Sequence, residues 1–417
     1  MEQKMLKLSN KIKLVLNQVD GSEIFCVSIL IASGYAEEKA DREGVTYMLS
    51  RLMLSGTTRY MNRDTINLKI KAMGGKIDTQ IYEEYTKISL TVPKSRALSA
   101  INFLAELVFN LKFNEQNFEI EKKMALVEQE KYLQNPNFVG RQYLRFLAFK
   151  RTGLCNSPLG KAKTLEKLTM EEVRNYFHKI LHPKNIVISC AGSFDETDVK
   201  QVCEDKFGEG APYSELAKPE KYVPVIFGKD EYEKYKVRNL YQTRFFLGFR
   251  APDYNDFKKY YISIYLKMVE FFCYKYFSTK PYFFGVNTDN LTYSNNGLAV
   301  VHFMVNHEDV DKALTEFNEC MEKTKNTLLP ELFEIEKKNL IGELLRSFNS
   351  MDEISVRCGI QYLYSKKPYN NTEIIEQIQK MTFQEYQNVI QTYITQDKMY
   401  VAYVGKKVDS VKDKFTF

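Results

Sequence analysis

The most constraining feature of this chain is a sequence that occurs twice. Residues 118–123 have the sequence FEIEKK, and the same six residues recur at 333–338, an offset of 215. Residues 168–192 also align without a gap with residues 381–405, at an offset of 213. In both copies of this second match, a helical pattern is followed by a strand pattern. Two matches at nearly one offset predict that a structural unit has been duplicated.

The duplication predicts two homologous domains, at 1–210 and 229–417. At 417 residues the chain is long enough for each domain to have its own core. The linker between the domains is expected at 211–228, a segment with three prolines and a thin apolar pattern. Strands are clustered with helices and do not alternate strictly with them. This arrangement favours an α+β fold with a largely antiparallel sheet in each domain.

The first strands and one later helix can be predicted from local patterns. Residues 6–18 and 24–32 are apolar and β-branched, which predicts two strands on either side of a turn at Asp20 and Gly21. The long aromatic and aliphatic run at 260–277 is interrupted by charged residues. It is therefore expected to be a buried amphipathic helix and not a membrane span.

Composition excludes several classes of protein. The 59 basic and 53 acidic residues are spread through the chain, and no basic stripe or aromatic RNA-binding motif suggests nucleic acid. The seven cysteines are an odd number without C-x-x-C spacing, as expected of free thiols in a reducing compartment. Residues 1–16 lack a signal-peptide core and the composition of a mitochondrial presequence. We therefore expect a cytoplasmic protein that binds neither nucleic acid nor a membrane.

Residues 44–57 contain the most informative local motif. Their apolar residues recur at three-and-four spacing, and glycines stand at both ends, which predicts a helix with one buried face. The segment resembles the active-site helix of the M16 family of zinc peptidases, which includes insulinase and the mitochondrial processing peptidase. That family has the pattern G-x-x-H-F-L-E-H-M-L-F-x-G-T. Its two histidines bind zinc, and its glutamate activates a water molecule.

The three functional positions of the family motif are substituted in this chain. Tyr47 and Arg51 stand where the histidines are expected, and Ser50 stands where the glutamate is expected. Tyrosine is a poor ligand at neutral pH, serine is a weak base, and arginine stays protonated. The resemblance therefore implies a peptidase fold of two homologous α+β domains, arranged as a clamshell half, without a catalytic residue or metal ligand in this motif.

The resemblance further implies two glutamates on a later helix, a third zinc ligand at Glu128 and a supporting residue at Glu121. The two are seven residues apart and so share one helical face. They could form a solvated acidic face, or they could be at least half-buried. If the fold is retained, Arg51 is expected to face Glu128 and to form charge-assisted hydrogen bonds with it and with Glu121.

A possible peptide-binding strand follows Gly74 and Gly75, where the sequence resembles the family's substrate-binding edge, G-G-x-x-N-A-x-T. An exposed edge can bind an extended peptide as an additional strand, while an ordinary sheet edge is the alternative. The candidate peptide-binding residues are Lys76, Ile77, Asp78, Thr79 and Gln80.

Two other features bear on a catalytic or metal site. The arginine and tyrosine with which active members steady the substrate carbonyl have no clear counterpart, because no arginine occurs between Arg250 and Arg346. A helix is predicted at 170–181. His178 and His182 stand four residues apart at its end and could form a displaced metal site. Neither a glutamate between them nor a third ligand is evident, and such short motifs often occur by chance.

The sequence thus predicts an inactive M16-family subunit that pairs with an active subunit carrying an intact H-x-x-E-H motif. Together they would bind and process extended peptides, with precursor or leader peptides as a plausible class. Zinc is expected only in the partner. One alternative is a peptide-binding protein that works alone or as a homodimer. Another is an active metallopeptidase with a rearranged site.

Overall fold

The computed structural model describes residues 2–150, 152–209, 233–237, 240–326, 329–365 and 369–417. The chain forms two compact units. Unit 1 comprises Met1–Gln129, Asn156–Lys221 and Leu345–Asn370, and unit 2 comprises Glu130–Cys155, Tyr222–Leu344 and Asn371–Phe417. Each unit is a sheet flanked by helices, so the prediction of an α+β fold with two homologous domains is confirmed. The predicted linker, 211–228, lies outside the described residues.

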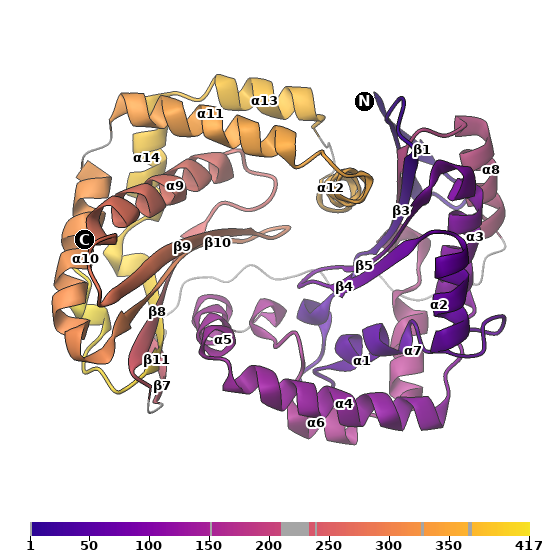
Figure 1. Ribbon diagram of the computed structural model, residues 1–417, viewed down its shortest axis with the longest axis horizontal. Coiled ribbons are helices and arrows are strands. Elements are labelled where there is room, and N and C mark those ends of the chain that lie inside the picture. Colours follow the sequence, from indigo (N-terminus) through magenta and orange to yellow (C-terminus); the bar gives the residue numbers. More distant parts are fainter. Residues whose placement is uncertain (1, 151, 210–232, 238–239, 327–328, 366–368) are drawn as a thin grey trace. The chain divides into compact units, whose positions relative to one another are not determined.

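Unit 1 is built on a six-stranded sheet with the order β1-β2-β6-β3-β5-β4 (Figure 1). Its strands are β1 (Glu2–Lys7), β2 (Lys13–Gln18), β3 (Ile24–Ile31), β4 (Lys76–Ile81), β5 (Thr86–Pro93) and β6 (Ile186–Gly192). Only β2 and β6 are parallel neighbours. The strand predicted at 6–18 is interrupted, because the chain turns at Lys11 with a φ of 74°. Moreover, β6 lies between β2 and β3, although these two strands are consecutive in sequence.

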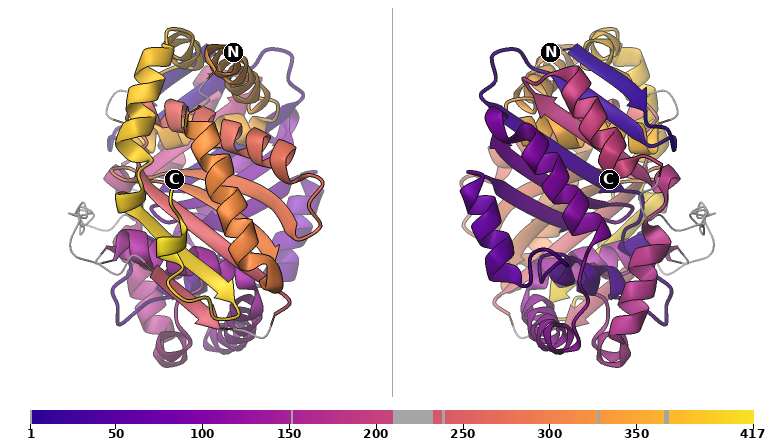
Figure 2. Two further views of the ribbon diagram at one scale, coloured as in Figure 1. Left: turned by 90° about the vertical axis from the view of Figure 1, so that its left-hand side faces the viewer. Right: turned by 90° about the vertical axis from the view of Figure 1, so that its right-hand side faces the viewer.

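Helices cover both faces of this sheet. They are α1 (Val45–Leu52), α2 (Arg63–Ala72), α3 (Ala97–Phe109), α4 (Glu115–Gln134), α6 (Ala162–Lys167), α7 (Met170–Ile180), α8 (Glu196–Phe207) and α12 (Met351–Tyr364). The main core of the unit joins α1, α3, α7 and α8 to one face of the sheet. Helices cross this face in the right-hand view of Figure 2. On the other face α12 packs against Val15, Leu30 and Val187.

Unit 2 repeats this plan with a five-stranded sheet of order β7-β11-β8-β10-β9. Its strands are β7 (Glu233–Val237), β8 (Gln242–Ala251), β9 (Phe283–Thr292), β10 (Gly297–Asn306) and β11 (Met399–Gly405). Its helices are α5 (Pro136–Phe149), α9 (Lys258–Phe277), α10 (Val310–Asn326), α11 (Pro330–Arg346), α13 (Asn371–Gln379) and α14 (Phe383–Tyr393). The helix predicted at 260–277 is α9, and its apolar residues enter the core of the unit.

Each unit contains one helix from the other half of the sequence. The helix α12 packs on β3 and β6 in unit 1, and α5 packs on β8 and β11 in unit 2. The two helices are related by the repeat offset of 215, and their packing is complementary. In unit 1, Gly359 of α12 lies against Leu30, whereas in unit 2 Leu144 of α5 lies against Gly248. A small residue thus faces a large one in both copies, with the roles of helix and strand exchanged.

Candidate functional site

The helix α1 is held at its start by a buried carboxylate. Gly44 precedes the helix with a φ of 103°, a left-handed conformation that glycine adopts without strain. Glu38 accepts hydrogen bonds from the backbone N–H groups of Gly44, at 2.7 Å, and Thr46, at 2.8 Å. It therefore satisfies donors that the first helical turn leaves unpaired. Because Val45, Met48, Leu49 and Leu52 are buried in the core, the side chains of the motif are directed to the opposite face.

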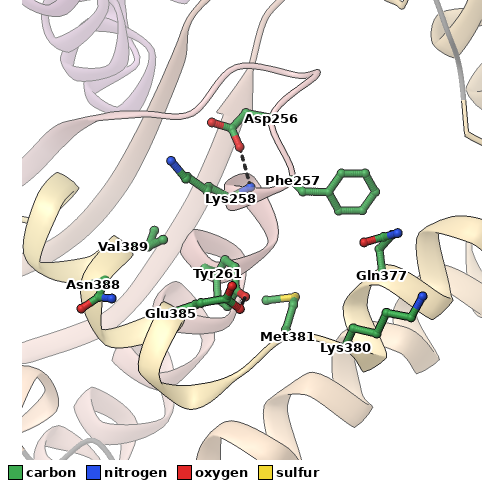
Figure 3. Close-up of a pocket in the computed structure, with 10 residues that line it drawn as sticks. All are labelled: Asp256, Phe257, Lys258, Tyr261, Gln377, Lys380, Met381, Glu385, Asn388 and Val389. Carbon is green, nitrogen blue, oxygen red and sulfur yellow. Dashed lines mark hydrogen bonds between the residues drawn. The ribbon is translucent and has the colours of Figure 1, made fainter.

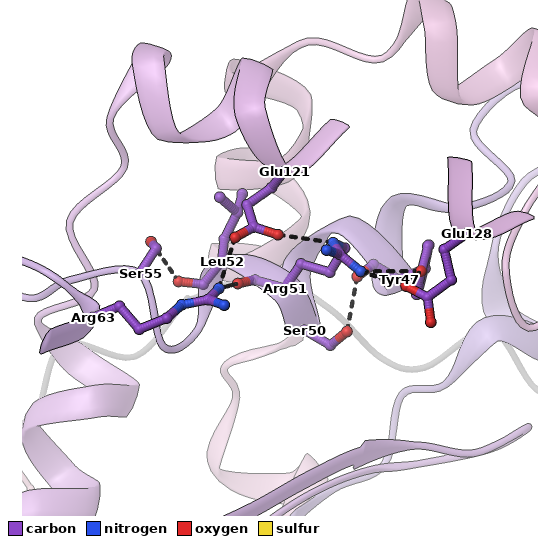
Figure 4. A network of polar contacts seen from close by, with 8 residues as sticks. All are labelled: Tyr47, Ser50, Arg51, Leu52, Ser55, Arg63, Glu121 and Glu128. Atoms are coloured by element: carbon purple, nitrogen blue, oxygen red, sulfur yellow. Dashed lines mark hydrogen bonds and ion pairs between the residues drawn. The ribbon is translucent and has the colours of Figure 1, made fainter. Parts of the chain in front are cut away.

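Arg51 bridges two carboxylates of α4 (Figure 4). Its Nε donates to Glu121 Oε2 at 2.8 Å, and its Nη1 donates to Glu128 Oε2 at 2.6 Å. The side chain of Arg51 is 16% exposed, while those of Glu121 and Glu128 are 9% and 38% exposed. The structure therefore brings Arg51, Glu121 and Glu128 together, in the contact that the family resemblance implies.

Tyr47 and Arg63 complete this network. Tyr47 donates its hydroxyl hydrogen to Glu128 Oε2 at 2.6 Å and accepts from Arg51 Nη1 at 3.2 Å. Arg63, at the start of α2, donates to Glu121 Oε1 at 2.7 Å and to the Arg51 carbonyl oxygen at 3.2 Å. No spacing rule connects Arg63 with the motif at the level of sequence. Ser50 only donates to the Tyr47 carbonyl oxygen, at 2.8 Å, which is a bond within its own helix.

The charges of the network balance, with two guanidinium groups facing two carboxylates. Burial and the hydrogen bond to Glu128 raise the pKa of Tyr47, against the opposing effect of the Arg51 charge, so its phenol stays protonated at neutral pH. Burial alone would lower the pKa of Arg51, but Tyr47 and the two carboxylates raise it overall. Each carboxylate of the network is therefore paired with at least one guanidinium group, and a fixed cation stands at its centre.

These residues do not fit a zinc ion. A guanidinium has only donors and cannot coordinate a cation. Glu128 Oε2, the oxygen nearest to the motif, already accepts hydrogen bonds from Arg51 and Tyr47. The Tyr47 phenol has a raised pKa and is therefore a poor source of an anionic ligand. Among the described residues, no group of three or more His, Cys, Asp or Glu side chains is placed to hold a metal ion.

Unit 2 contains a related ion pair at the repeat offset. Glu343 and Glu336 of α11 lie 215 residues after Glu128 and Glu121. Lys267 of α9 donates to Glu343 at 2.8 Å, with both side chains 37% exposed. A basic residue thus joins α1 to the glutamate-bearing α4 in unit 1, and another joins α9 to the glutamate-bearing α11 in unit 2. The network around Arg51 differs from this pair in being more buried and in joining both glutamates.

The histidine pair does not form a site. The helix α7 ends at Ile180, so His182 lies beyond it, and the prediction of two histidines on one helical face is wrong. Lys184 N–H donates to His182 Nδ1 at 3.1 Å, a contact that caps the following short turn. The helix ends here because Pro183 cannot continue it. His178 is exposed on α7.

The candidate peptide-binding strand β4 lies at the open edge of the sheet of unit 1. Tyr82 N–H donates to Tyr85 O at 2.8 Å, so these two residues form a hydrogen-bonded pair. Hydrogen-bonded and non-hydrogen-bonded pairs alternate along the β4–β5 ladder from this point. In that ladder the backbone groups of Ile77, Thr79 and Ile81 point away from β5. Among the described residues, no hydrogen bond is made to these groups, so they are available to a further strand.

The corresponding edge of unit 2 is partly closed. Thr288 of β9 donates its backbone N–H to Glu270 of α9 at 2.9 Å, and Asn290 donates its side chain to the Lys259 carbonyl at 2.8 Å. The segment comparable to the family's arginine and tyrosine region, residues 274–285, runs from the end of α9 into β9. There Tyr274 is 77% exposed and Phe284 is 40% exposed. Of the two sheets, unit 1 therefore offers the freer edge.

Unit 2 also has a cavity of about 520 Å³ between the start of α9 and the helices α13 and α14 (Figure 3). Tyr261 on its wall donates to Glu385 at 2.6 Å, and Asp256 accepts from the Lys258 N–H at 2.8 Å. Glu385 also belongs to the capping box of α14 with Thr382. These polar groups hold helix ends in place, and no catalytic arrangement is evident among them.

Comparison with known proteins identifies the family. The profile described as "Insulinase (Peptidase family M16)" matches residues 14–162, and the profile described as "Peptidase M16 inactive domain" matches residues 167–340. Together they cover most of the chain, and the chain belongs to the M16 peptidase family. No helix in the described part of the chain is long and apolar enough to cross a membrane.

Individual relatives have modest sequence identity. The "Uncharacterized zinc protease YmxG" of Bacillus subtilis is 21% identical over 93% of this chain and 95% of that protein. The "Mitochondrial-processing peptidase subunit beta" of Dictyostelium discoideum is 25% identical, but the match covers 49% of this chain and 44% of that protein. A solved structure described as a peptidase M16 inactive domain from Pseudomonas fluorescens aligns with a TM-score of 0.88 at 16% identity, over 98% of each chain. This last likeness concerns the fold alone.

Proposed function

We propose that this chain is a catalytically inactive M16-family subunit that pairs with an active zinc-peptidase subunit to bind and process peptides. The observation that carries the proposal is the position of Arg51, which bridges Glu121 and Glu128 where the family resemblance implies zinc. A fixed cation there repels a metal ion and occupies the acceptors that a metal would need. Catalysis therefore has to come from a partner with an intact H-x-x-E-H motif.

We assign the peptide-binding role of this chain to the strand β4. Ile77, Thr79 and Ile81 present backbone donors and acceptors along an open edge, next to α1. An extended peptide can pair with such an edge as a further strand, largely independently of its sequence. The side chains of Lys76, Asp78 and Gln80 lie on one face of the extended sheet, and those of Ile77 and Thr79 lie on the other face.

The name of one relative supports a paired arrangement and a processing substrate. The Dictyostelium relative is by name a subunit of a processing peptidase. Precursor or leader peptides are therefore the substrate class that we assign to the complex. The compartment that we propose remains the cytoplasm.

The edge assignment is tested by binding of a fluorescein-labelled extended peptide, measured by fluorescence anisotropy. Thr79→Pro removes an N–H that faces the open edge and leaves the β4–β5 hydrogen bonds intact, because proline is tolerated at this side of an edge strand. We expect this variant to bind the peptide at least about tenfold more weakly, since it loses a backbone bond and blocks the approach of the strand. Thr79→Val, which keeps the N–H, is the matched control and should bind like the wild type.

The pairing is tested by cleavage assays. The purified chain alone should not cut the peptide, and addition of an M16 chain with an intact H-x-x-E-H motif from the same organism should produce cleavage above that of the added chain. Peptide binding without any gain in cleavage, from a chain that forms no mixed complex, would favour a separate peptide-binding protein. Metal-dependent cleavage by the purified chain alone would instead establish a rearranged active site.

A further inference from the structure

Two buried thiols are in contact in the core of unit 2. Cys273 lies near the end of α9, and Cys320 lies in α10. Their sulfur atoms are 3.6 Å apart, and the two residues are only 1% and 2% exposed. They are separated by 47 positions in the sequence. The contact therefore comes from the packing of α10 against α9, which no cysteine spacing in the sequence indicates.

Only a small movement separates this contact from a covalent bond. A disulfide has an S–S length of about 2.05 Å, so the two sulfur atoms must approach each other by about 1.5 Å. Partial rotation of the two side chains about their Cα–Cβ bonds can supply an approach of this size. The bond can therefore form with only a small displacement of the two helices.

The surroundings make the two thiols chemically unequal. The hydrogen bond from Cys273 lowers the pKa of Cys320, against the effect of burial. Thr324 and the positive charge of Lys323 act on Cys320 in the same direction. The same hydrogen bond raises the pKa of Cys273, together with burial and the negative charge of Glu270. Because the thiolate is the reactive form of a cysteine, Cys320 is the better nucleophile, while Cys273 holds its proton.

Three buried thiols elsewhere hold their protons more tightly than usual. Burial raises the pKa of Cys26 to about 12 and that of Cys358 to about 12. In unit 1, Cys190 of β6 forms a hydrogen bond with Cys203 of α8, and this bond and burial raise the pKa of Cys190 well above its usual value. Among the described residues, the groups that shift the pKa of Cys190 include no cation. The pair in unit 2 is therefore the contact in which ionisation of one sulfur atom is favoured.

We propose that Cys273 and Cys320 are a modification site, at which a peroxide converts the two thiols into a disulfide that links α9 to α10. The proposal is independent of the function proposed above. First, the Cys320 thiolate attacks one oxygen of hydrogen peroxide, so that an S–O bond forms and the O–O bond breaks. The hydroxide that leaves takes up the proton that Cys320 released. The product is water and the sulfenic acid of Cys320.

The second step forms the disulfide. The sulfur atom of Cys273 attacks the sulfur atom of Cys320, and the S–O bond breaks. The proton of Cys273 leaves with the hydroxide as a second water molecule. The two thiols have then lost two electrons, and the peroxide has gained them.

The bond would stabilise unit 2. It closes a covalent loop between residues 47 positions apart, which contains β9 and β10, and so restricts the unfolded chain. The thiols are buried, so the oxidant must enter during a local opening of the helices. Hydrogen peroxide is only slightly larger than water, and a brief opening is therefore enough to admit it.

The experiment treats the reduced full chain with a small molar excess of hydrogen peroxide. Free thiols are blocked with N-ethylmaleimide, and the protein is then unfolded, digested without a reductant and mapped by mass spectrometry. A parallel sample contains dimedone, which traps sulfenic acids. The wild type is compared with Cys273→Ala and with Cys190→Ala. The second variant is the matched control, because it removes one sulfur atom of the buried thiol contact in unit 1.

We expect peptides joined through Cys273 and Cys320 in the wild type and in Cys190→Ala. In Cys273→Ala, dimedone should label Cys320, because the thiol that would displace the hydroxide is missing. The melting temperature of the oxidised wild type should exceed that of the reduced protein by about 5 °C, and dithiothreitol should reverse the change.

The map of the wild type decides the question even if Cys273→Ala does not fold. Absence of the joined peptides from the peroxide-treated wild type would overturn the proposal. A disulfide that forms but leaves the melting temperature unchanged would overturn it as well, since the bond would then not stabilise unit 2.

Discussion

The guanidinium group of Arg51 lies 2.6 Å from a carboxylate oxygen of Glu128, a residue 77 positions later in the chain. This bond joins α1 to α4. A second bond joins Arg51 to Glu121, which lies about two helical turns earlier in α4. The same two helices would hold the metal in the zinc peptidases that the motif resembles. In the function proposed above, Arg51 stands in place of the metal ion, and its two contacts join the same two helices.

Arg51→Met should lower the free energy of unfolding by about 3 kcal/mol, because it leaves Glu121 largely buried with only Arg63 as a partner. Urea denaturation of the two proteins measures the difference. Lys267→Met breaks the more exposed pair with Glu343 in unit 2 and should cost about 1 kcal/mol or less. Equal losses in the two variants would show that burial of the Arg51 network adds nothing.

Tyr47 should stabilise the network through its hydroxyl group. Tyr47→Phe keeps the ring and removes the bond to Glu128, so a loss of about 1–2 kcal/mol in unfolding free energy is expected. A double-mutant cycle with Glu128→Gln should show a coupling of about 1 kcal/mol or more, as for residues that share one network. Additive effects of the two substitutions would count against a shared network.

Glu38 should make stability depend on pH near neutrality. Burial raises the pKa of this carboxyl to about 7 from its usual 4.5, against the hydrogen bonds from Gly44 and Thr46. The folded state therefore holds the proton more tightly than the unfolded state. The contribution of Glu38 is most favourable below its usual pKa and is lost as the pH rises towards 7, by up to about 1.4 kcal/mol per pH unit.

Glu38→Gln has no ionisable group at this position and serves as the reference. Denaturation of both proteins at pH 5.5 and pH 8 should show that the wild type loses stability relative to the variant at the higher pH. A difference between the two proteins that does not change with pH would contradict this prediction.

The packing of α12 on the sheet should depend on a glycine. A Cβ at Gly359 would lie 2.5 Å from the Leu30 side chain, so Gly359→Ala should destabilise unit 1 by about 1–3 kcal/mol despite its better helix propensity. Leu30→Ala should cost less stability in Gly359→Ala than in the wild type, because the added methyl group fills part of the space that the substitution opens. Calorimetric melting of the single and double variants measures both effects, and an unchanged melting temperature in Gly359→Ala would show that this contact is loose.

Sequence patterns predict the repeat and the α+β class, and the family resemblance implies the placement of Arg51 beside the two glutamates. Its periodicity also located α1 and α9. It did not predict that α5 and α12 pack on the sheet of the opposite half. Helical spacing shows that a helix has an apolar face, but it does not show which sheet covers that face. The sequence pattern does not reveal the turn at Lys11 that divides the strand predicted at 6–18, because the residues on either side of it continue the apolar pattern.

Sequence patterns also do not identify the site residues that lie outside the motif. Arg63 joins the network from the start of another helix, and nothing in its spacing to Arg51 indicates a contact. Glu38 lies in a charged segment, where a solvated side chain is the ordinary expectation, yet it is buried against α1. The helical pattern continues to His182, yet α7 ends two residues before it. Such contacts depend on how loops return to the core, which local patterns do not encode.

The most direct test of the account is the zinc content of the purified chain, measured by mass spectrometry together with that of the variant Tyr47→His, Ser50→Glu, Arg51→His. The variant restores the family motif next to Glu128. We predict well under one zinc per chain for the wild type and close to one for the variant, because only the substituted side chains prevent coordination. Close to one zinc per wild-type chain would contradict the central claim that Arg51 replaces the metal.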